Sequence, residues 1–78
     1  MIKFNLRKLI EDKEFAEDRR ITILEIAEET GISRNTLSKI INKRGYDTAI
    51  SNLEKLCLYF KCSPDEIIRL VPDPSKDD

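Results

Sequence analysis

The stretch from Thr22 to Asn42, TILEIAEETGISRNTLSKIIN, constrains the fold of this chain more than any other segment. Its first half has the features of a helix start, because Thr22 can accept a hydrogen bond from the amide three residues on and Glu25 can reach back to it. Apolar residues then recur at helical spacing. Gly31 follows, where a left-handed residue commonly ends a helix. The pattern predicts a short helix that stops at Gly31.

The second half of this stretch predicts another short helix. Ile32 is apolar and can pack back onto the first helix, and Ser33 is a favourable N-cap. Leu37, Ile40 and Ile41 give the new helix an apolar side. Two short helices joined by a glycine turn form either a DNA-binding helix-turn-helix or a plain helical hairpin within a bundle.

The charges on the second helix favour the DNA-binding alternative. The whole chain has 14 basic and 15 acidic residues and a net charge of −1, yet no acidic residue occurs from Ile32 to Tyr46. The basic residues in that run are Arg34, Lys39, Lys43 and Arg44. A duplex-binding protein needs such a positive face to displace counterions from phosphates. The sorting of charge therefore indicates a DNA-binding surface.

Position along the second helix separates two predicted roles. Arginine can bind guanine and asparagine can bind adenine through paired hydrogen bonds, and the first turns of a recognition helix point into the groove. The residues that we expect to contact base edges are Arg34, Asn35 and Ser38. The residues that we expect to contact phosphate are Ser33, Thr36, Lys39, Lys43, Arg44 and Tyr46. For Tyr46, a half-buried packing role is the alternative.

The two-helix unit resembles the helix-turn-helix of the Cro-type phage repressors and their bacterial relatives. The resemblance rests on Ala27, where a small residue lets helices cross closely, on Gly31, and on Leu37 and Ile40, which pack the second helix down. It extends less specifically over residues 5–71. It implies an all-α, compact five-helix fold like that of the lambda repressor. It also implies double-stranded DNA as a partner and a homodimer, at least on DNA.

Three further helices are predicted from apolar residues at helical spacing. The first is marked by Leu6, Leu9 and Ile10 and continues towards Phe15 or Ala16. The fourth, capped by Asp47 or Thr48, is marked by Ile50, Leu53, Leu56, Cys57 and Phe60. The fifth begins with a capping box from Ser63 to Glu66 and has Pro64 in its first position. It continues through Ile67, Ile68, Leu70 and Val71.

Two groups of apolar residues are open to more than one interpretation. Those of the fifth helix are candidates for a dimer surface, although we expect Ile67 and Leu70 to complete the core instead. Phe4 and Phe15 are expected in the core or at helix ends. The alternation in Met1–Phe4 is too short to predict a strand.

The charged connector between the first two helices contains Arg19 and Arg20. In one interpretation these arginines approach phosphate, because they lie just ahead of a helix start. In the other they form surface ion pairs with Glu17 and Asp18. The sequence does not decide between the two.

Length and composition bound the architecture and the location. At 78 residues there is room for one domain with a modest core, predicted over residues 1–72, followed by a polar tail over 73–78. Two glycines, three prolines and scarce alternation favour an all-α fold. No apolar run approaches a membrane span and no signal-peptide pattern is present. We therefore expect a cytoplasmic protein that does not enter a membrane.

The sequence contains no candidate catalytic residues and no candidate metal site. There is no histidine, and the two cysteines, Cys57 and Cys62, cannot complete a tetrahedral zinc site within one chain. On a continuous helix their Cα atoms would lie roughly 8–9 Å apart, too far for a disulfide. We expect no catalytic residue, metal, cofactor or small-molecule ligand. The function predicted is a sequence-specific regulator of transcription that binds double-stranded DNA, most simply a repressor. The alternative is an antitoxin-like or scaffolding protein-interaction module on the same fold.

Overall fold

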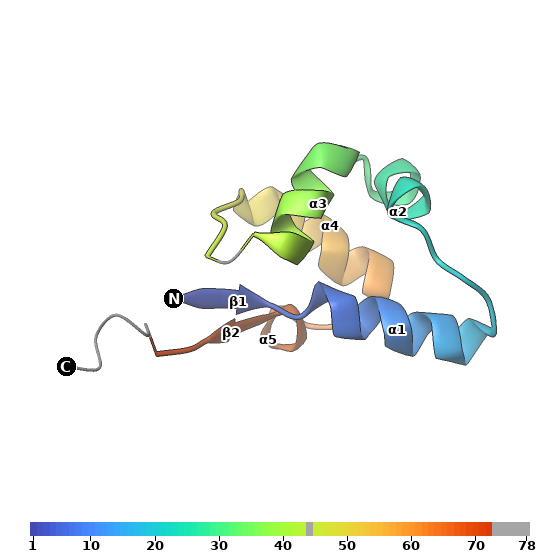
Figure 1. The fold of residues 1–78 in the computed structure, drawn as a ribbon, viewed down its shortest axis with the longest axis horizontal. Helices are drawn as coiled ribbons and strands as arrows, with labels where there is room; N and C mark the ends of the chain where they lie inside the picture. Colours follow the sequence, from blue (N-terminus) through green and yellow to red (C-terminus); the bar gives the residue numbers. More distant parts are fainter. Residues whose placement is uncertain (44, 73–78) are drawn as a thin grey trace.

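A short strand begins the chain, five helices follow, and a second short strand returns beside the first (Figure 1). The computed structural model describes residues 1–43 and 45–72. The elements are β1 (Ile2–Phe4), α1 (Leu6–Glu17), α2 (Ile23–Thr30), α3 (Arg34–Asn42), α4 (Ile50–Phe60), α5 (Pro64–Ile67) and β2 (Ile68–Leu70). The mainly helical, five-helix fold expected from the sequence is confirmed, with a small sheet added. Arg44 and the predicted tail over 73–78 lie outside the described residues.

A single apolar core joins all five helices. Its fully buried members are Leu6, Ile21, Ile26, Ile32, Leu37, Ile40, Leu56 and Ile67. Helix α2 contacts both α3 and α4, and α1 contacts α3, so the two helices of the central motif are held from several sides. In Figure 1, α4 passes behind α3, which leaves the near side of α3 open.

The connector between α1 and α2 contributes to this core in a way that the sequence analysis missed. Helix α1 ends at Asp18, whose φ of 51° is left-handed. The chain then turns so that Ile21, only 6% exposed, enters the core. The backbone N–H of Ile21 donates to a carboxylate oxygen of Glu14 at 2.7 Å. This bond replaces the hydrogen bond to water that the N–H loses when Ile21 is buried. The backbone at Ile21 is therefore anchored to α1.

The fifth helix is shorter than predicted, because a strand replaces its second half. Helix α5 ends at Ile67, and Ile68 is already extended, with φ −116° and ψ 151°. Strand β2 pairs antiparallel with β1, in the register Ile2↔Leu70, Lys3↔Arg69 and Phe4↔Ile68. Ile68 is β-branched and suits an extended chain, and the ladder with β1 supplies the backbone hydrogen bonds that a longer helix would have made internally.

Ile67 is in the core as expected, but Leu70 is not. Ile67 is fully buried, whereas Leu70 is 76% exposed. Leu70 shares the face of β2 that carries Ile68, but it lies two residues farther along the strand, beyond the core, so the prediction that Leu70 completes the core is wrong. Phe4, at the other end of the paired ladder, packs against the core as predicted.

Two further predictions need correction. Phe15 is 91% exposed, so it neither joins the core nor plugs a helix end, because α1 turns this position to solvent. The N-cap of α4 is Ala49, which has no side-chain cap, rather than Asp47 or Thr48. Thr48 instead accepts a hydrogen bond from the amide of Asn52 at 2.9 Å. Ile50, in the first turn, is 78% exposed, so the apolar side of α4 starts later than predicted.

The two cysteines are free and half-buried. Cys57 lies on α4 and packs against the core, while Cys62 follows the end of that helix and packs there too. Burial, with Cys57 nearby, raises the pKa of the Cys62 thiol. Both therefore act as small apolar residues, and the two thiols are not joined in a disulfide, which agrees with the sequence analysis.

Candidate nucleic-acid interface

The turn between α2 and α3 has the geometry predicted for Gly31. Its φ of 78° is left-handed, and its N–H donates to the carbonyl of Ala27 at 2.8 Å, which closes the end of α2. The hydroxyl of Thr30 accepts the N–H of Ile32 at 3.2 Å, and Ile32 is only 4% exposed. The buried Ile32 fixes where α3 begins relative to α2.

The start of α2 differs from the predicted capping box in one respect. Thr22 accepts the N–H of Glu25 at 3.1 Å, as expected. The carboxylate of Glu25 is instead bound by Arg19, through bonds of 2.8 and 2.7 Å from its two terminal nitrogens. A charged guanidinium with two parallel donors is a stronger partner for the carboxylate than a single backbone N–H.

Helix α3 begins with the predicted serine cap. Ser33 Oγ accepts the N–H of Thr36 at 3.1 Å and donates to the Thr36 hydroxyl at 2.9 Å. The side chains of Ser33 and Thr36 thus already bind each other. Arg34 and Asn35, which occupy the first turn, are exposed and make no such local bond among the described residues.

The two sides of α3 are chemically distinct. Leu37 and Ile40 are buried, with 0% and 2% exposure. Asn35, Lys39 and Asn42 follow one another at four- and three-residue steps on the opposite side, and all three are exposed. A helix that is buried on one side and polar on the other can present its polar side to a ligand without disturbing the core.

Asn42 was missed as a site residue in the sequence analysis. Its carbonyl oxygen accepts a hydrogen bond from Arg7 of α1 at 2.7 Å, and its amide nitrogen donates to Ser38 at 3.3 Å. The helical spacing from Asn35 could have placed Asn42 on the polar side. The contact with Arg7 joins distant parts of the chain and left no signal in the sequence. Ser38, predicted to contact bases, is half-buried and already accepts this bond.

The cations of α3 have no carboxylate partners within residues 1–43 and 45–72. The ion pairs found there link Lys8 with Asp12, Lys13 with Glu17, and Arg19 with both Glu17 and Glu25. Arg34, Lys39 and Lys43 belong to none of them and are exposed. Their charges are therefore available to an anionic ligand.

Lys43 and Tyr46 lie together after α3. The ammonium of Lys43 lies 5.9 Å from the centre of the Tyr46 ring, close enough for a cation–π contact. Tyr46 is half-buried and packs against the core, which agrees with the packing alternative. Arg44, the remaining predicted phosphate contact, lies outside the described residues.

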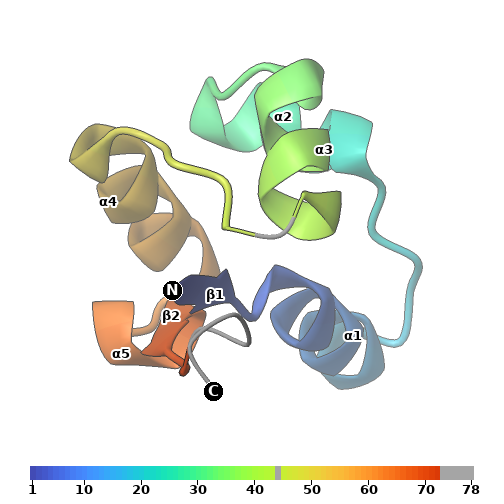
Figure 2. The same ribbon diagram turned by 60° about the vertical axis from the view of Figure 1, so that its left-hand side comes forward.

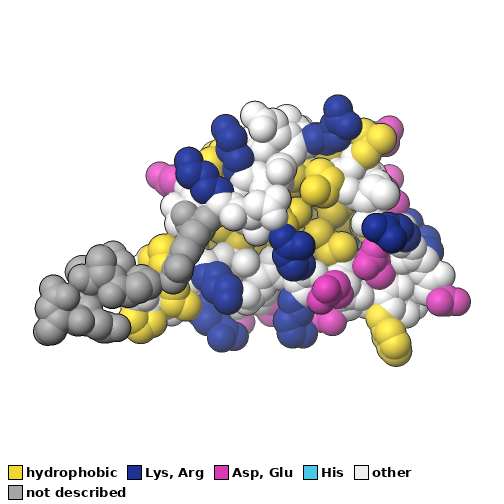
Figure 3. Space-filling model, in the orientation of Figure 1, with side chains coloured by type: hydrophobic (Ala, Val, Ile, Leu, Met, Phe, Trp, Pro, Cys, Tyr) yellow, Lys and Arg dark blue, Asp and Glu magenta, His cyan; other side chains and the backbone are white. Residues whose placement is uncertain are grey.

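The surface seen in Figure 3 shows charge sorted over this face. Lysine and arginine side chains gather around the uncharged polar surface of α3 and over the β1–β2 end of the molecule. Acidic side chains on this face lie mostly along α1 and at the α2 end, on the right of the view. Basic side chains therefore occur on this face both beside α3 and at the sheet end.

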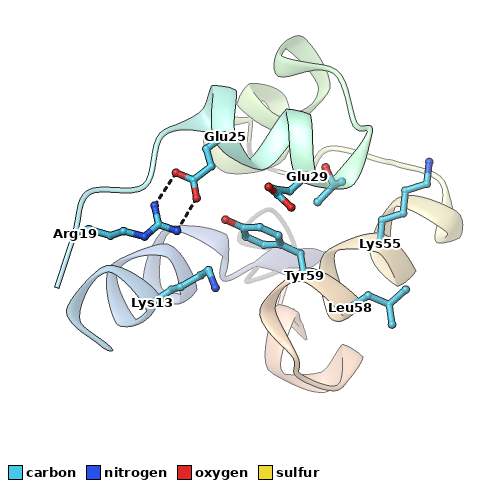
Figure 4. A pocket seen from close by; sticks show the side chains of 8 residues that line it. Lys13, Arg19, Glu25, Glu29, Lys55, Leu58 and Tyr59 are labelled. Carbon is cyan, nitrogen blue, oxygen red and sulfur yellow. Dashed lines mark hydrogen bonds and ion pairs between the residues drawn. The ribbon is translucent and has the colours of Figure 1, made fainter. Parts of the chain in front are cut away.

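Arg19 belongs to a different surface. It lines an open cleft of about 600 Å³ between α1, α2 and α4, together with Lys13, Glu25, Glu29 and Tyr59 (Figure 4). The ion-pair interpretation holds for Arg19, and the paired hydrogen bond lowers the pKa of Glu25 and raises that of Arg19. Because both signs of charge line this cleft, it does not match a phosphate backbone.

Comparison with known proteins agrees with this geometry. A model of the Cro/C1-type HTH DNA-binding domain family matches residues 5–73. No curated protein matches the chain. Within the described residues, no helix has both the length and the apolar character needed to cross a membrane. The match spans all five helices, the two-sided α3 among them, and strand β2, and the chain belongs to the Cro/C1-type helix-turn-helix DNA-binding domain family.

Proposed function

We propose that this protein is a sequence-specific regulator of transcription that binds double-stranded DNA, and most simply a repressor that occupies its operator in the cytoplasm. In this proposal α3 lies in the major groove, with residues 33–43 forming the recognition segment. A protein that blocks an operator needs no catalytic group, and a single small domain is sufficient for that role.

The observation that carries the proposal is the two-sided character of α3. Leu37 and Ile40 hold the helix to the core, while its opposite side presents two exposed asparagines and Lys39 with no carboxylate partner among the described residues. An α-helix fits the major groove, and amide side chains can bind adenine through paired hydrogen bonds there. A purely structural helix in this position would not need an acid-free surface.

The proposed roles follow position on the helix. Base contacts are assigned to Arg34, Asn35 and Ser38, and Asn42 is added because it lies in line with Asn35. Phosphate contacts are assigned to Ser33, Thr36, Lys39, Lys43, Arg44 and Tyr46. The cation–π contact with Tyr46 supports a fixed position for the Lys43 ammonium.

We further propose that two copies bind together on DNA. One recognition helix covers about one half-site, and two-fold related helices must reach half-sites roughly 34 Å apart. Ile2 and Leu70, directly paired in the sheet, are 40% and 76% exposed and supply apolar surface that a second copy would cover. Sedimentation with and without a two-half-site operator tests this, and a complex that contains one copy on such an operator would contradict it.

Binding measurements on a selected operator and on random DNA, at several salt concentrations, test the main proposal. Asn35→Ala should cost about 1–3 kcal/mol on the operator alone and relax the choice at one base pair. Lys43→Ala should weaken binding to all sequences and reduce the salt slope by about one unit.

Two outcomes would count against the proposal. If Asn35→Ala weakened both DNAs equally and Lys43→Ala changed sequence preference, the assigned roles would be wrong. If the folded protein bound neither DNA, a protein-interaction module would become the better description of this fold.

A further inference from the structure

The two-stranded sheet places like charges opposite one another. In its register Lys3 faces Arg69 directly, so the two side chains project from the same face of the sheet at neighbouring positions. Both residues are exposed, and within the described part of the chain neither takes part in an ion pair. Directly opposed like charges destabilise a strand pair. The sheet therefore carries a charge pair that its own stability does not explain.

The opposite face of the sheet is the one that packs against the core. Phe4 and Ile68 pack against the core from that side. A shallow apolar groove of about 260 Å³ runs there beside α4, lined by Ile2, Phe4 and Ile68 of the sheet and by Leu53 of the helix. Because side chains alternate along a strand, Lys3 and Arg69 project away from this packed side. Any pair of polar side chains could occupy these two exposed positions, so the stability of the fold does not require that both be cations.

A second groove lies between Lys3 of this pair and the end of α3. It has a volume of about 270 Å³, and much of its lining is apolar surface of β1 and α3. Its polar lining is Lys3 of β1 and Asn42 and Lys43 at the end of α3, and Met1 and Val71 line it at the sheet end. Among the described residues that line it, none is acidic. Figure 2 brings this end forward and shows β1 and β2 between α4 and α1, beneath the last turn of α3. The charged side chains among the described residues that line the groove, Lys3 of the sheet and Lys43 after α3, are therefore both cations.

We propose that the β1–β2 sheet is a second phosphate-binding surface of the DNA interface. Lys3 and Lys43 approach one backbone phosphate from the two sides of this groove, and Arg69, beside Lys3, binds the same or the adjacent phosphate. The partner is the backbone of the same duplex that α3 enters, beyond the base pairs that α3 faces. Neutralisation by phosphate turns the repulsion between Lys3 and Arg69 into a favourable arrangement in the complex. This inference rests on the proposed function.

The test uses Lys3→Gln, Arg69→Gln and the double variant in the full chain. Lys55→Gln is the matched control, because Lys55 is an exposed lysine that lines the mixed-charge cleft of Figure 4. Each sheet variant should reduce the salt slope of binding by about one unit, equally on the selected operator and on random DNA of the same length. Lys55→Gln should leave the slope unchanged. The thermal midpoint of the double variant should not fall, because it removes a repulsion.

Shortened duplexes locate the contact. The difference between the wild-type protein and the double variant should disappear when the base pairs beyond the α3 site are removed, while the effect of Asn35→Ala persists. If the sheet variants behave like Lys55→Gln while Lys43→Ala and Asn35→Ala still weaken binding, the sheet proposal is overturned and the proposed function stands. If the wild-type protein shows no binding to either DNA, both are overturned.

Discussion

Arg7 on α1 and Asn42 at the end of α3 are joined by a hydrogen bond of 2.7 Å between a guanidinium nitrogen and the amide oxygen. The bond directs the Asn42 oxygen to Arg7 and its nitrogen to Ser38. The orientation of an amide proposed to read a base is thus set by a residue outside the helix-turn-helix.

Arg7→Ala should affect DNA binding more than folding. Both partners are exposed, so the free energy of unfolding should change by no more than about 0.5 kcal/mol. Loss of one orienting hydrogen bond should weaken binding to the operator about two- to tenfold. Lys8→Ala is the control, because it removes an equal charge from the same turn of α1 but pairs with Asp12. Equal binding by the two variants would show that the Arg7–Asn42 bond does not position Asn42.

Gly31→Val should destabilise the fold by about 1–2 kcal/mol, because a β-branched residue must adopt positive φ. A Cβ added at Gly31 meets no atom within 4 Å, so the cost should come from the backbone and not from a clash. Gly31→Asn should therefore cost less, since asparagine tolerates the left-handed region. Thermal melts of both variants distinguish a backbone cause from a steric one. Equal losses of stability in the two variants would indicate a steric cause instead.

Ser33→Ala should destabilise the fold by about 0.5–2 kcal/mol, because the Thr36 N–H loses its cap. Ser33→Asp should restore most of that stability, since aspartate is an equally good cap and its charge favours a helix N-terminus. The same aspartate should weaken DNA binding if Ser33 lies near phosphate. Melts and binding measured on the same two variants separate these roles. Unimpaired DNA binding by Ser33→Asp would remove Ser33 from the proposed phosphate contacts.

The Arg19–Glu25 pair predicts a loss of stability in acid. The hydrogen bonds from Arg19 hold the pKa of Glu25 below its ordinary value of 4.5, so the folded state binds the proton more weakly than the unfolded state does. The contribution of the pair is complete above pH 4.5 and is lost as the pH falls through the lowered pKa. Glu25→Gln should therefore lower the free energy of unfolding at neutral pH. The difference in this free energy between the variant and the wild-type protein should become smaller as the solution is acidified. A difference that stays constant between neutral pH and pH 3 would contradict this.

The local features of the central motif could be predicted from the sequence because their causes are local. The serine cap on Thr36, the left-handed Gly31 and the buried side of α3 each depend on residues within about one helical turn. Periodicity also placed Leu37 and Ile40 in the core, and the burial of Ile32 agrees with the expectation that it packs back onto the preceding helix. The polar side of α3, and with it Arg34, Asn35 and Lys39 at the surface, follows from the same periodicity.

Contacts between distant segments were decided only by the tertiary structure. Strand β2 forms because β1 is available to pair with it, although its residues also fit a helical period. Arg19 takes the carboxylate of Glu25 away from the expected capping box, and Arg7 reaches Asn42 from 35 positions away. Helical spacing determines which residues share one side of a helix. Which distant residue a side chain or strand then bonds to depends on the segments that packing brings together. For that reason the sequence determined helix α3 and its two sides, and the tertiary structure determined which residues surround it.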